Sequence, residues 1–264
     1  MTLKKNKVKH ILKTGGVTVG SWLSLGHESI AEIMSAAGFD WLAIDLEHSV
    51  IDVEKLHSLI LAIETNECVP LVRLTGNDPN LAKRVMDAGA YGVIVPMIKS
   101  AGDAELAVKS IKYPPQGQRS VGIARAHGYG PRFKDYVKVA NEESILIIQI
   151  EHVASVRNLE EILEVEGIDG LMIGPYDLSG SLGLPGELEH PKVVEAKKKI
   201  LEVAKEKGIA AGIHVVYPSI SEFKKCLEEG YRFIAFGADI LFLGGSCRDS
   251  VKDIKELLPK VGNQ

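Results

Sequence analysis

The feature that most constrains the fold of this chain is a unit that occurs five times. In each unit a helical segment ends at a glycine, two or three residues follow, and an apolar run begins. A glycine there suits the left-handed conformation at a helix end, and continuous apolar runs are typical of parallel strands buried on both faces. The units are "AAGFDWLAIDLE", "DAGAYGVIVPM", "VEGIDGLMIGP", "EKGIAAGIHVV" and "EEGYRFIAFGA", with Gly38, Gly89, Gly167, Gly208 and Gly230 at the helix ends.

Helical patterns separate the apolar runs along the whole chain. In one of them Asp78 is expected to cap the helix, with Pro79 at its first position, and another repeats the arrangement at Pro191. Eight strands alternating with helices predict one (β/α)8 barrel domain over residues 1–264. A doubly wound open sheet is the competitor, but no GxGxxG motif follows the first strand. The predicted strands are 17–25, 41–48, 69–74, 92–97, 145–151, 170–175, 210–216 and 233–240.

Three segments outside the repeat carry further expectations. The basic N-terminus lacks the apolar core of a signal peptide, so it is predicted to form a short capping helix. The long segment 113–136 is rich in Gly, Pro and Arg, and is either a functional loop or a surface or subunit contact. Near the C-terminus an apolar stripe at helical spacing predicts a helix with one apolar face. The stripe consists of Val251, Ile254, Leu257 and Leu258.

Composition excludes some classes of protein and suggests a compartment. The formal net charge is −4 and the pI is near 6.1, which argues against a nucleic-acid partner. No apolar run approaches the roughly 18 residues of a membrane span, so no membrane partner is expected. Cys68, Cys226 and Cys247 are odd in number and scattered, which indicates reduced thiols in a cytoplasmic protein.

Polar residues stand at the carboxyl ends of several predicted strands, which converge on one face of such a barrel. Glu151 and Asp177 end two neighbouring strands and would repel each other unless a cation joined them. A carboxylate pair suits a hard cation such as Mg²⁺ or Mn²⁺, with Co²⁺ as a further candidate. The other polar residues at these ends are Asp45, Glu47, His48, Arg73 and Gln149.

Each of these residues also has a purely structural interpretation. Glu151 could favour the dipole of the next helix, and Asp177 could cap a short turn. Arg73 is costly to bury without an anion, which could be a substrate or a structural partner such as Asp45 or Glu47.

Two histidines leave similar alternatives. His48 stands three residues after Asp45, so it is either a base oriented by that carboxylate or an exposed histidine. His214, in the seventh predicted strand, could line the mouth of the barrel.

Six pieces of sequence stand in a fixed order between Gly38 and Pro191, within a likeness that runs from about Gly20 to the last predicted strand. They are "GFDWLAIDLEHS", "VPLVRL", "YPPQGQRSVG", "IIQIEHV", "VEGIDGLMIGPYDLSGSLG" and "HP" at His190–Pro191. As an ordered set they resemble the HpcH/HpaI family of metal-dependent pyruvate aldolases. The resemblance implies a barrel of the phosphoenolpyruvate/pyruvate type whose last helix is exchanged between subunits. It also implies a homo-hexamer built as a trimer of dimers.

The resemblance assigns roles at the barrel mouth. It implies that Glu151 and Asp177 bind a divalent metal, and that His48, paired with Asp45, is the catalytic base. One departure borders the site, because Leu46 replaces a glycine found in many members.

Substrate binding is implied for a second set of residues. Arg73 is expected to be both catalytic and substrate-binding, and Gln149 is expected to contact the substrate. The backbone amides of Tyr176 and Asp177 are expected to hold the substrate carboxylate. Glu47 is expected to hold a water molecule beside the metal. Tyr176 is a further departure, since alanine or serine is common there.

The implied activity is cleavage of a 4-hydroxy-2-oxo acid to pyruvate and an aldehyde through a metal-stabilised enolate. The alternatives are a citrate-lyase-type acyl-CoA lyase and a non-catalytic metabolite-binding relative. A phosphate-binding isomerase barrel is a further alternative, because "LFLGGS" at 241–246 offers glycines near the last strand.

Overall fold

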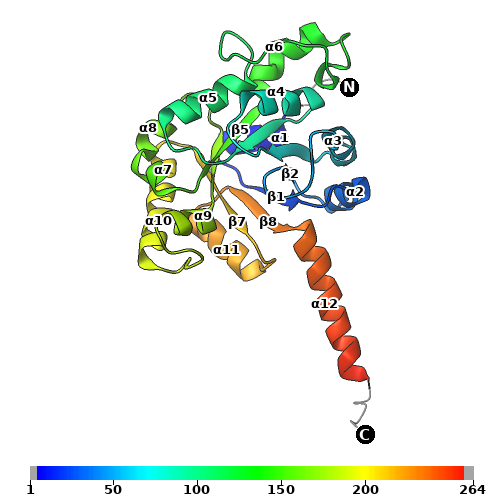
Figure 1. Cartoon of the computed structure of the whole chain (residues 1–264), viewed down its shortest axis with the longest axis vertical. Coiled ribbons are helices and arrows are strands. Elements are labelled where there is room, and N and C mark those ends of the chain that lie inside the picture. The colour runs from blue at the N-terminus through cyan, green and yellow to red at the C-terminus, as the bar shows by residue number, and fades with distance from the viewer. Residues whose placement is uncertain (1–4, 259–264) are drawn as a thin grey trace.

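The computed structural model describes residues 5–258, and its centre is a closed barrel of eight parallel strands in sequence order (Figure 1). Every neighbouring pair is parallel, and β1 closes the barrel against β8. The predicted (β/α)8 barrel is therefore confirmed. The strands are β1 Thr18–Leu23, β2 Trp41–Asp45, β3 Val69–Arg73, β4 Gly92–Val95, β5 Ile145–Ile150, β6 Gly170–Ile173, β7 Ala210–Val215 and β8 Phe233–Ala238.

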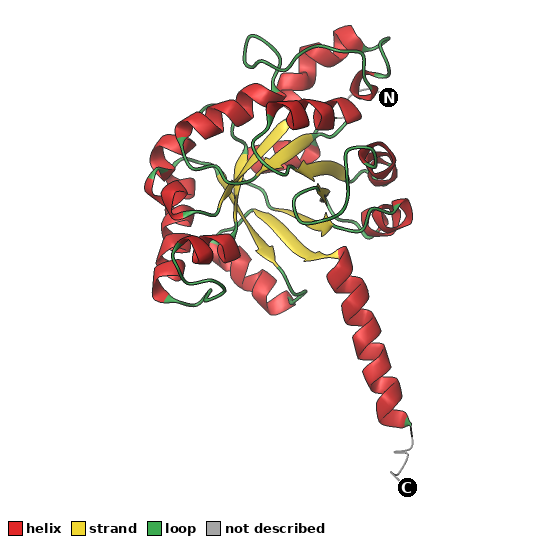
Figure 2. Ribbon diagram, in the orientation of Figure 1, coloured by secondary structure: helices red, strands yellow, loops and turns green. Residues whose placement is uncertain are grey.

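Helices surround the strands, as Figure 2 shows by colour. Most apolar side chains between the two layers are fully buried, which is why the strands carry few polar residues. The helices are α1 Lys7–Lys13, α2 Glu28–Ala36, α3 Leu56–Glu64, α4 Pro79–Ala88, α5 Ala101–Ile111, η1 Arg125–His127, α6 Phe133–Glu143, α7 Val153–Arg157, α8 Leu159–Leu163, α9 Pro175–Ser181, α10 Pro191–Glu206, α11 Ile220–Glu229 and α12 Asp239–Leu257.

Two stacked aromatic rings fill the interior of the barrel near its amino-terminal end. Trp41 and Phe233 lie 4.1 Å apart between ring centroids with an interplanar angle of 9°. A Cβ at Gly20 would lie 2.0 Å from the Trp41 ring, so only glycine leaves room for it. Val8 and Leu12 of α1 belong to the same buried cluster, so the predicted N-terminal helix packs against this end.

The predicted helix ends are present in the structure. The Asp78 side chain accepts a hydrogen bond from the backbone N–H of Asn80 at the start of α4, and Pro79 follows it. The five repeat glycines all have a left-handed backbone, with φ between 72° and 104°. These turns allow each helix to end sharply before the next strand begins.

Some predicted boundaries were wrong at the strand ends. β2 ends at Asp45, so Glu47 and His48 belong to the loop that follows and not to the strand. The segment 241–246 lies inside α12. Its glycines therefore do not form the strand-end loop that a phosphate site of the isomerase type would need.

The segment 113–136 is partly helical and is anchored by two arginines. Arg119 is buried, with Nη2 2.6 Å from the Oδ1 of Asp87 in α4. Arg125 pairs with Glu64 at the end of α3, with Nη2 and Oε2 2.5 Å apart. Because α3 and α4 end near the amino ends of the strands, this segment lies away from the barrel mouth within one chain.

The last helix behaves differently from the others. α12 begins at β8 and extends away from the barrel (Figure 1). From residue 246 to residue 258 every residue is exposed. Within residues 5–258, no helix is both long and apolar enough to cross a bilayer.

Candidate active site

A cavity of about 410 Å³ opens at the carboxyl ends of the strands. Seven of the eight residues predicted for the site line it. They come from β2, β3, β5, the residues that follow β2 and β5, and α9. Glu47, the eighth, borders the cavity through Arg73, whose Nη1 lies 3.3 Å from Glu47 Oε2. The seven are Asp45, His48, Arg73, Gln149, Glu151, Tyr176 and Asp177.

Arg73 is fixed by its neighbours on β2 and β1. Its Nε and Nη2 donate to the Oδ1 and Oδ2 of Asp45 at 2.9 and 2.7 Å, and its guanidinium lies 4.4 Å from the Trp22 ring centroid. Asp45 and Arg73 are paired residues in the β2–β3 register, which is why both side chains reach the same point. Hydrogen bonds and the charge of Arg73 keep the pKa of the Asp45 carboxyl below its ordinary value despite burial.

Glu151 follows β5 directly and is 3% exposed. Its Oε1 accepts from the backbone N–H of Met97 at 2.7 Å, and its Oε2 accepts from Nε2 of Gln149. A Cβ at Gly174 would lie 2.6 Å from Glu151 Oε2, so the carboxylate occupies the space that a side chain there would need. Burial raises the pKa of Glu151, since a buried carboxylate loses its hydration.

Asp177 and Tyr176 lie in the first turn of α9, just after Gly174. Both side chains are exposed to the cavity mouth. The first amides of a helix lack partners within that helix, so the amides of Tyr176 and Asp177 are available to an anion. The negative charge of Asp177 also raises the pKa of Glu151 by repulsion, so the two acids are close enough to interact.

Glu47 has the most perturbed carboxyl group of the site. Burial raises its pKa to about 7, with further increases from the charges of Glu151, Asp45 and Asp177 and a partly opposing effect of Arg73. The site therefore gathers four carboxyl groups around one guanidinium. Such an excess of acid favours the binding of a cation.

His48 is less constrained than the sequence suggested. Its side chain is 65% exposed, and its Nε2 lies 4.0 Å from Glu47 Oε2. Asp45 Oδ1 accepts from the backbone N–H groups of Glu47 and His48. Among the described residues Asp45 has no hydrogen bond with the His48 ring, because both carboxylate oxygens face Arg73. The expected Asp45–His48 orientation is therefore replaced in this structure by an Asp45–Arg73 pair.

Sequence reasoning overlooked several residues of the mouth. Trp22 and Ser24 come from the first strand and the loop after it, and both line the cavity. Asp239, buried at the start of α12, accepts hydrogen bonds from the backbone N–H groups of Ser24 and Leu25 at 2.8 and 2.6 Å. Asp239 could have been found from the sequence, because it is a polar residue directly after the last strand, like the other residues predicted for the mouth.

The oxygen atoms of the site are consistent with a bound cation. Gln149 Oε1 is a buried acceptor without a hydrogen-bond partner among the described residues, although buried acceptors are normally paired. In the described part of the chain Glu47 Oε2 has only its ion pair with Arg73, at 3.3 Å, and a longer contact with His48, at 4.0 Å. Within the same residues, no three His, Cys, Asp or Glu side chains form a ready metal cluster. The donor set therefore fits a hard ion that takes further oxygen ligands from water or substrate.

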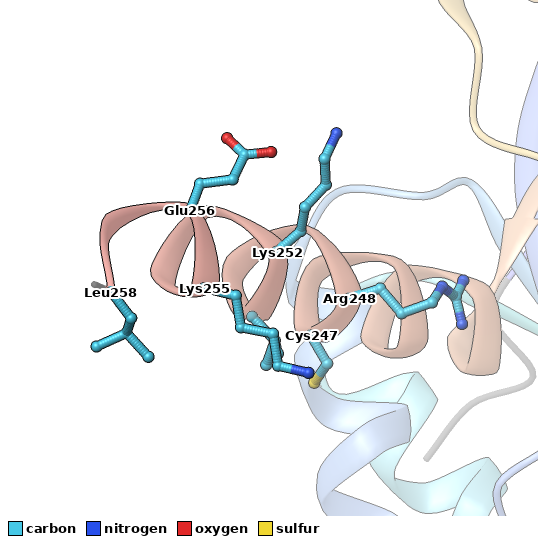
Figure 3. A pocket seen from close by; sticks show the side chains of 7 residues that line it. Cys247, Arg248, Lys252, Lys255, Glu256 and Leu258 are labelled. Carbon is cyan, nitrogen blue, oxygen red and sulfur yellow. The ribbon is translucent and has the colours of Figure 1, made fainter. Parts of the chain in front are cut away.

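Two of the larger hollows elsewhere lie along α12 and beside Arg125, and neither holds a predicted site residue. One runs along α12, where side chains between Cys247 and Leu258 form an open groove (Figure 3). All its walls come from a single helix, so it cannot enclose a small molecule. The other lies between α3, α4 and the 113–136 segment, on the side of Arg125.

Comparison with known proteins gives the family. Residues 18–244 match the family described as HpcH/HpaI aldolase/citrate lyase. The chain belongs to this family. Among HpcH/HpaI relatives, the 4-hydroxy-2-oxo-heptane-1,7-dioate aldolase of Escherichia coli (strain ATCC 8739) is 39% identical, over 90% of this chain and 91% of its own. The 2-keto-3-deoxy-L-rhamnonate aldolase of Salmonella gallinarum is 40% identical, over 90% and 89%.

Solved structures of the HpcH/HpaI family have the same fold. A family protein from Burkholderia cenocepacia superposes with a TM-score of 0.90 at 35% identity, covering 95% of this chain and 99% of its own. An HpcH/HpaI aldolase from Desulfitobacterium hafniense superposes with a TM-score of 0.89 at 31% identity, over 97% and 98%. The resemblance seen in the sequence is therefore confirmed over nearly the whole length of the chain.

Proposed function

We propose that this protein is a class II, pyruvate-dependent aldolase that cleaves a 4-hydroxy-2-oxo acid into pyruvate and an aldehyde. The observation that carries the proposal is the single cavity lined by Arg73, His48, Glu151 and Asp177. The named aldolases that this chain resembles at 39% and 40% identity support the same reaction.

Glu151 and Asp177 would hold the divalent ion, with Mg²⁺, Mn²⁺ and Co²⁺ as the candidates. The burial of Glu151 and the repulsion between the two acids favour a hard cation with oxygen ligands. The ion, when bound, supplies Lewis-acid stabilisation of the negative charge that develops on the keto oxygen of the substrate. The amides of Tyr176 and Asp177 would bind the carboxylate of the 2-oxo acid.

The side chains of the cavity perform the rest of the reaction. When the C3–C4 bond breaks, its electron pair passes toward the keto oxygen and the 4-hydroxyl group loses its proton. Arg73, held by two hydrogen bonds to Asp45, would donate to that oxygen without further reorganisation. His48 would accept the 4-hydroxyl proton, because it is the exposed base at the mouth. Gln149 would contact the substrate beside Glu151, and Glu47 would hold a water molecule at the site.

The alternatives have less support from the cavity. An acyl-CoA lyase must bind the phosphates of coenzyme A, yet Arg73 is the only Lys or Arg among the described residues that line the mouth. That arginine is already paired with Asp45 and Glu47. A non-catalytic relative would not need to retain Arg73, His48, Glu151 and Asp177 together.

We also propose that the protein assembles into a homo-hexamer, a trimer of dimers, through α12. Val251, Ile254 and Leu257 are 48%, 56% and 86% exposed on this projecting helix. An apolar stripe left open in one chain would be covered by another copy. The free cysteines Cys68, Cys226 and Cys247 fit the proposed cytoplasmic location.

The test measures pyruvate release from a panel of 4-hydroxy-2-oxo acids after treatment with a chelator. Each reaction is repeated with added Mg²⁺, Mn²⁺ or Co²⁺. Metal-dependent release from at least one acid is expected. Release that is unchanged by the chelator, or absent with every acid and metal, would contradict the proposal.

A further inference from the structure

His214 occupies an inward position of β7 at the mouth of the barrel. The alternation of the strand places Ala210 and Gly212 toward the interior cluster, and His214, two residues further, lines the active-site cavity. It is paired in register with Ala235 of β8. The polar ring is therefore part of the substrate cavity, on the side opposite the outer helices.

Hydrogen bonding fixes which nitrogen of the ring carries the proton. His214 Nε2 lies 3.0 Å from the backbone carbonyl oxygen of Gly237. A carbonyl oxygen can only accept, so Nε2 carries the hydrogen. Burial lowers the pKa of His214 to about 4, so the ring is neutral near pH 7. In that tautomer Nδ1 has a lone pair and no hydrogen, and acts as an acceptor.

The surroundings leave that acceptor available. Among the described residues the ring has no hydrogen bond other than the one to Gly237, and its edge packs against Trp22 with ring centroids 5.9 Å apart. The remaining neighbours that line the cavity here include the apolar Val216, Ile240 and Leu241. An acceptor at this position discriminates between ligands with and without a matching donor, because a ligand that covers it without offering a donor displaces its water and leaves it unpaired.

The charges of the mouth disfavour one kind of aldehyde half. Asp45, Glu151 and Asp177 line the cavity, and Arg73 is its only Lys or Arg among the described residues. Arg73 already pairs with two acids. An aldehyde with a second carboxylate would meet this acidic lining without a free cation. A neutral aldehyde with a hydroxyl donor suits the site better.

We propose that His214 determines specificity by accepting, at Nδ1, a hydrogen bond from a hydroxyl group on the aldehyde half of the substrate. The favoured substrates are then sugar-acid-like 2-oxo acids with a hydroxyl on the carbon next to the cleaved carbinol. This inference rests on the aldolase function proposed above. It adds the substrate class and the residue that recognises it.

The experiment runs the reaction in the direction of synthesis with two aldehydes that differ by one hydroxyl group. Pyruvate adds to lactaldehyde or to propanal, so that a C–C bond forms between the pyruvate methyl carbon and the aldehyde carbon. The pyruvate methyl carbon loses a proton, and the aldehyde oxygen gains one. The ratio of kcat/KM for lactaldehyde to that for propanal is measured for the wild type, His214→Leu and His214→Gln.

The expected result is a loss of discrimination. His214→Leu should lower the ratio by about tenfold, the worth of one hydrogen bond, with little change for propanal. His214→Gln, whose amide oxygen is an acceptor, should recover part of the ratio. The Gly237 carbonyl keeps its hydrogen bond from the Ser21 hydroxyl at 3.1 Å, so folding should persist. If His214→Leu does not fold, His214→Met takes its place.

Two controls separate the possible failures. His57→Leu makes the same chemical change on an exposed position of α3 and should leave the ratio unchanged. Metal-dependent deuterium exchange into the pyruvate methyl group should persist in His214→Leu. An unchanged ratio with normal exchange would overturn the role of His214 alone. If the wild type itself shows neither exchange nor aldol addition, the proposed function fails, and this inference fails with it.

Discussion

The guanidinium of Arg73 and the carboxylate of Asp45 form a two-point pair, with Nε–Oδ1 and Nη2–Oδ2 distances of 2.9 and 2.7 Å. Asp45 is 3% exposed, so the pair is held inside the mouth and the arginine plane is fixed against Trp22. Asp45 therefore orients Arg73 and not the proposed base His48. Mutation of Asp45 should first disturb the position of the Arg73 guanidinium.

Arg73→Lys should lose most of the activity even though the positive charge is kept. A lysine cannot donate to both Asp45 oxygens and to a substrate oxygen with a planar group. We expect kcat/KM for pyruvate release to fall by about 10²-fold or more, measured beside the thermal unfolding midpoint. Asp45→Asn should give a similar pattern. A variant with lower thermal stability but normal turnover would leave Arg73 only a structural role.

Gly174→Ala should damage the site through Glu151. The added Cβ would lie 2.6 Å from Glu151 Oε2, so the carboxylate must move from the position set by Met97 and Gln149. Metal affinity, measured by calorimetry with Mn²⁺, and activity should fall together. Gly180→Ala in α9, the helix that Gly174 caps, is the matched control, because its added Cβ would meet nothing within 4 Å beyond its chain neighbours and the backbone of its own helix. Equal affinities for the two variants would contradict this account.

Glu47→Gln should change how stability depends on pH. The folded pKa of Glu47 is raised to about 7 from 4.5, so the folded protein binds the proton more tightly than the unfolded chain. This contribution to the free energy of unfolding is full below about pH 4.5 and is lost as pH rises through about 7.

With a chelator present, Glu47→Gln should therefore become more stable relative to wild type between pH 5 and pH 8. Urea unfolding at several pH values measures the difference. Glu54→Gln, an exposed acid on the same loop, controls for net charge. A difference that does not vary with pH would show that Glu47 titrates normally.

His48→Ala should lower the rate of aldol cleavage by about 10²–10⁴-fold, the usual contribution of a general base. Metal affinity should hardly change, because His48 is not a proposed ligand. Deuterium exchange into the pyruvate methyl group should slow as well. Loss of metal binding would instead make the histidine a ligand. Wild-type cleavage and exchange would move the base elsewhere, with Glu47 the first candidate.

The exposed apolar stripe of α12 predicts that the protein is an oligomer in solution. Light scattering should give a mass that is a multiple of the 28.6 kDa chain, with six chains expected. Val251→Asp combined with Ile254→Asp should reduce the mass, because charges cannot be buried in an apolar interface. Val194→Asp, at a 41% exposed position of α10, is the control. A wild-type protein that stays monomeric would rule out the exchange of α12.

The sequence by itself determined the barrel and most of the mouth. Continuous apolar runs are typical of parallel strands buried on both faces; five of the eight follow a glycine helix end, and eight such strands close into one barrel. In any such barrel the carboxyl ends of all eight strands meet at one face. Arg73, Gln149 and Glu151 could be assigned to one mouth for this reason, before any side-chain position was known.

Only the tertiary structure decided how those residues pair. Sequence spacing suggested that Asp45 orients His48, but the β2–β3 register sets Asp45 beside Arg73, and a bidentate guanidinium pair is stronger than one imidazole bond. The tautomer of His214 likewise depends on Gly237, 23 positions away in the chain. Such choices arise from contacts between separate strands, where register and burial set which donor meets which acceptor, and local sequence patterns carry no record of them.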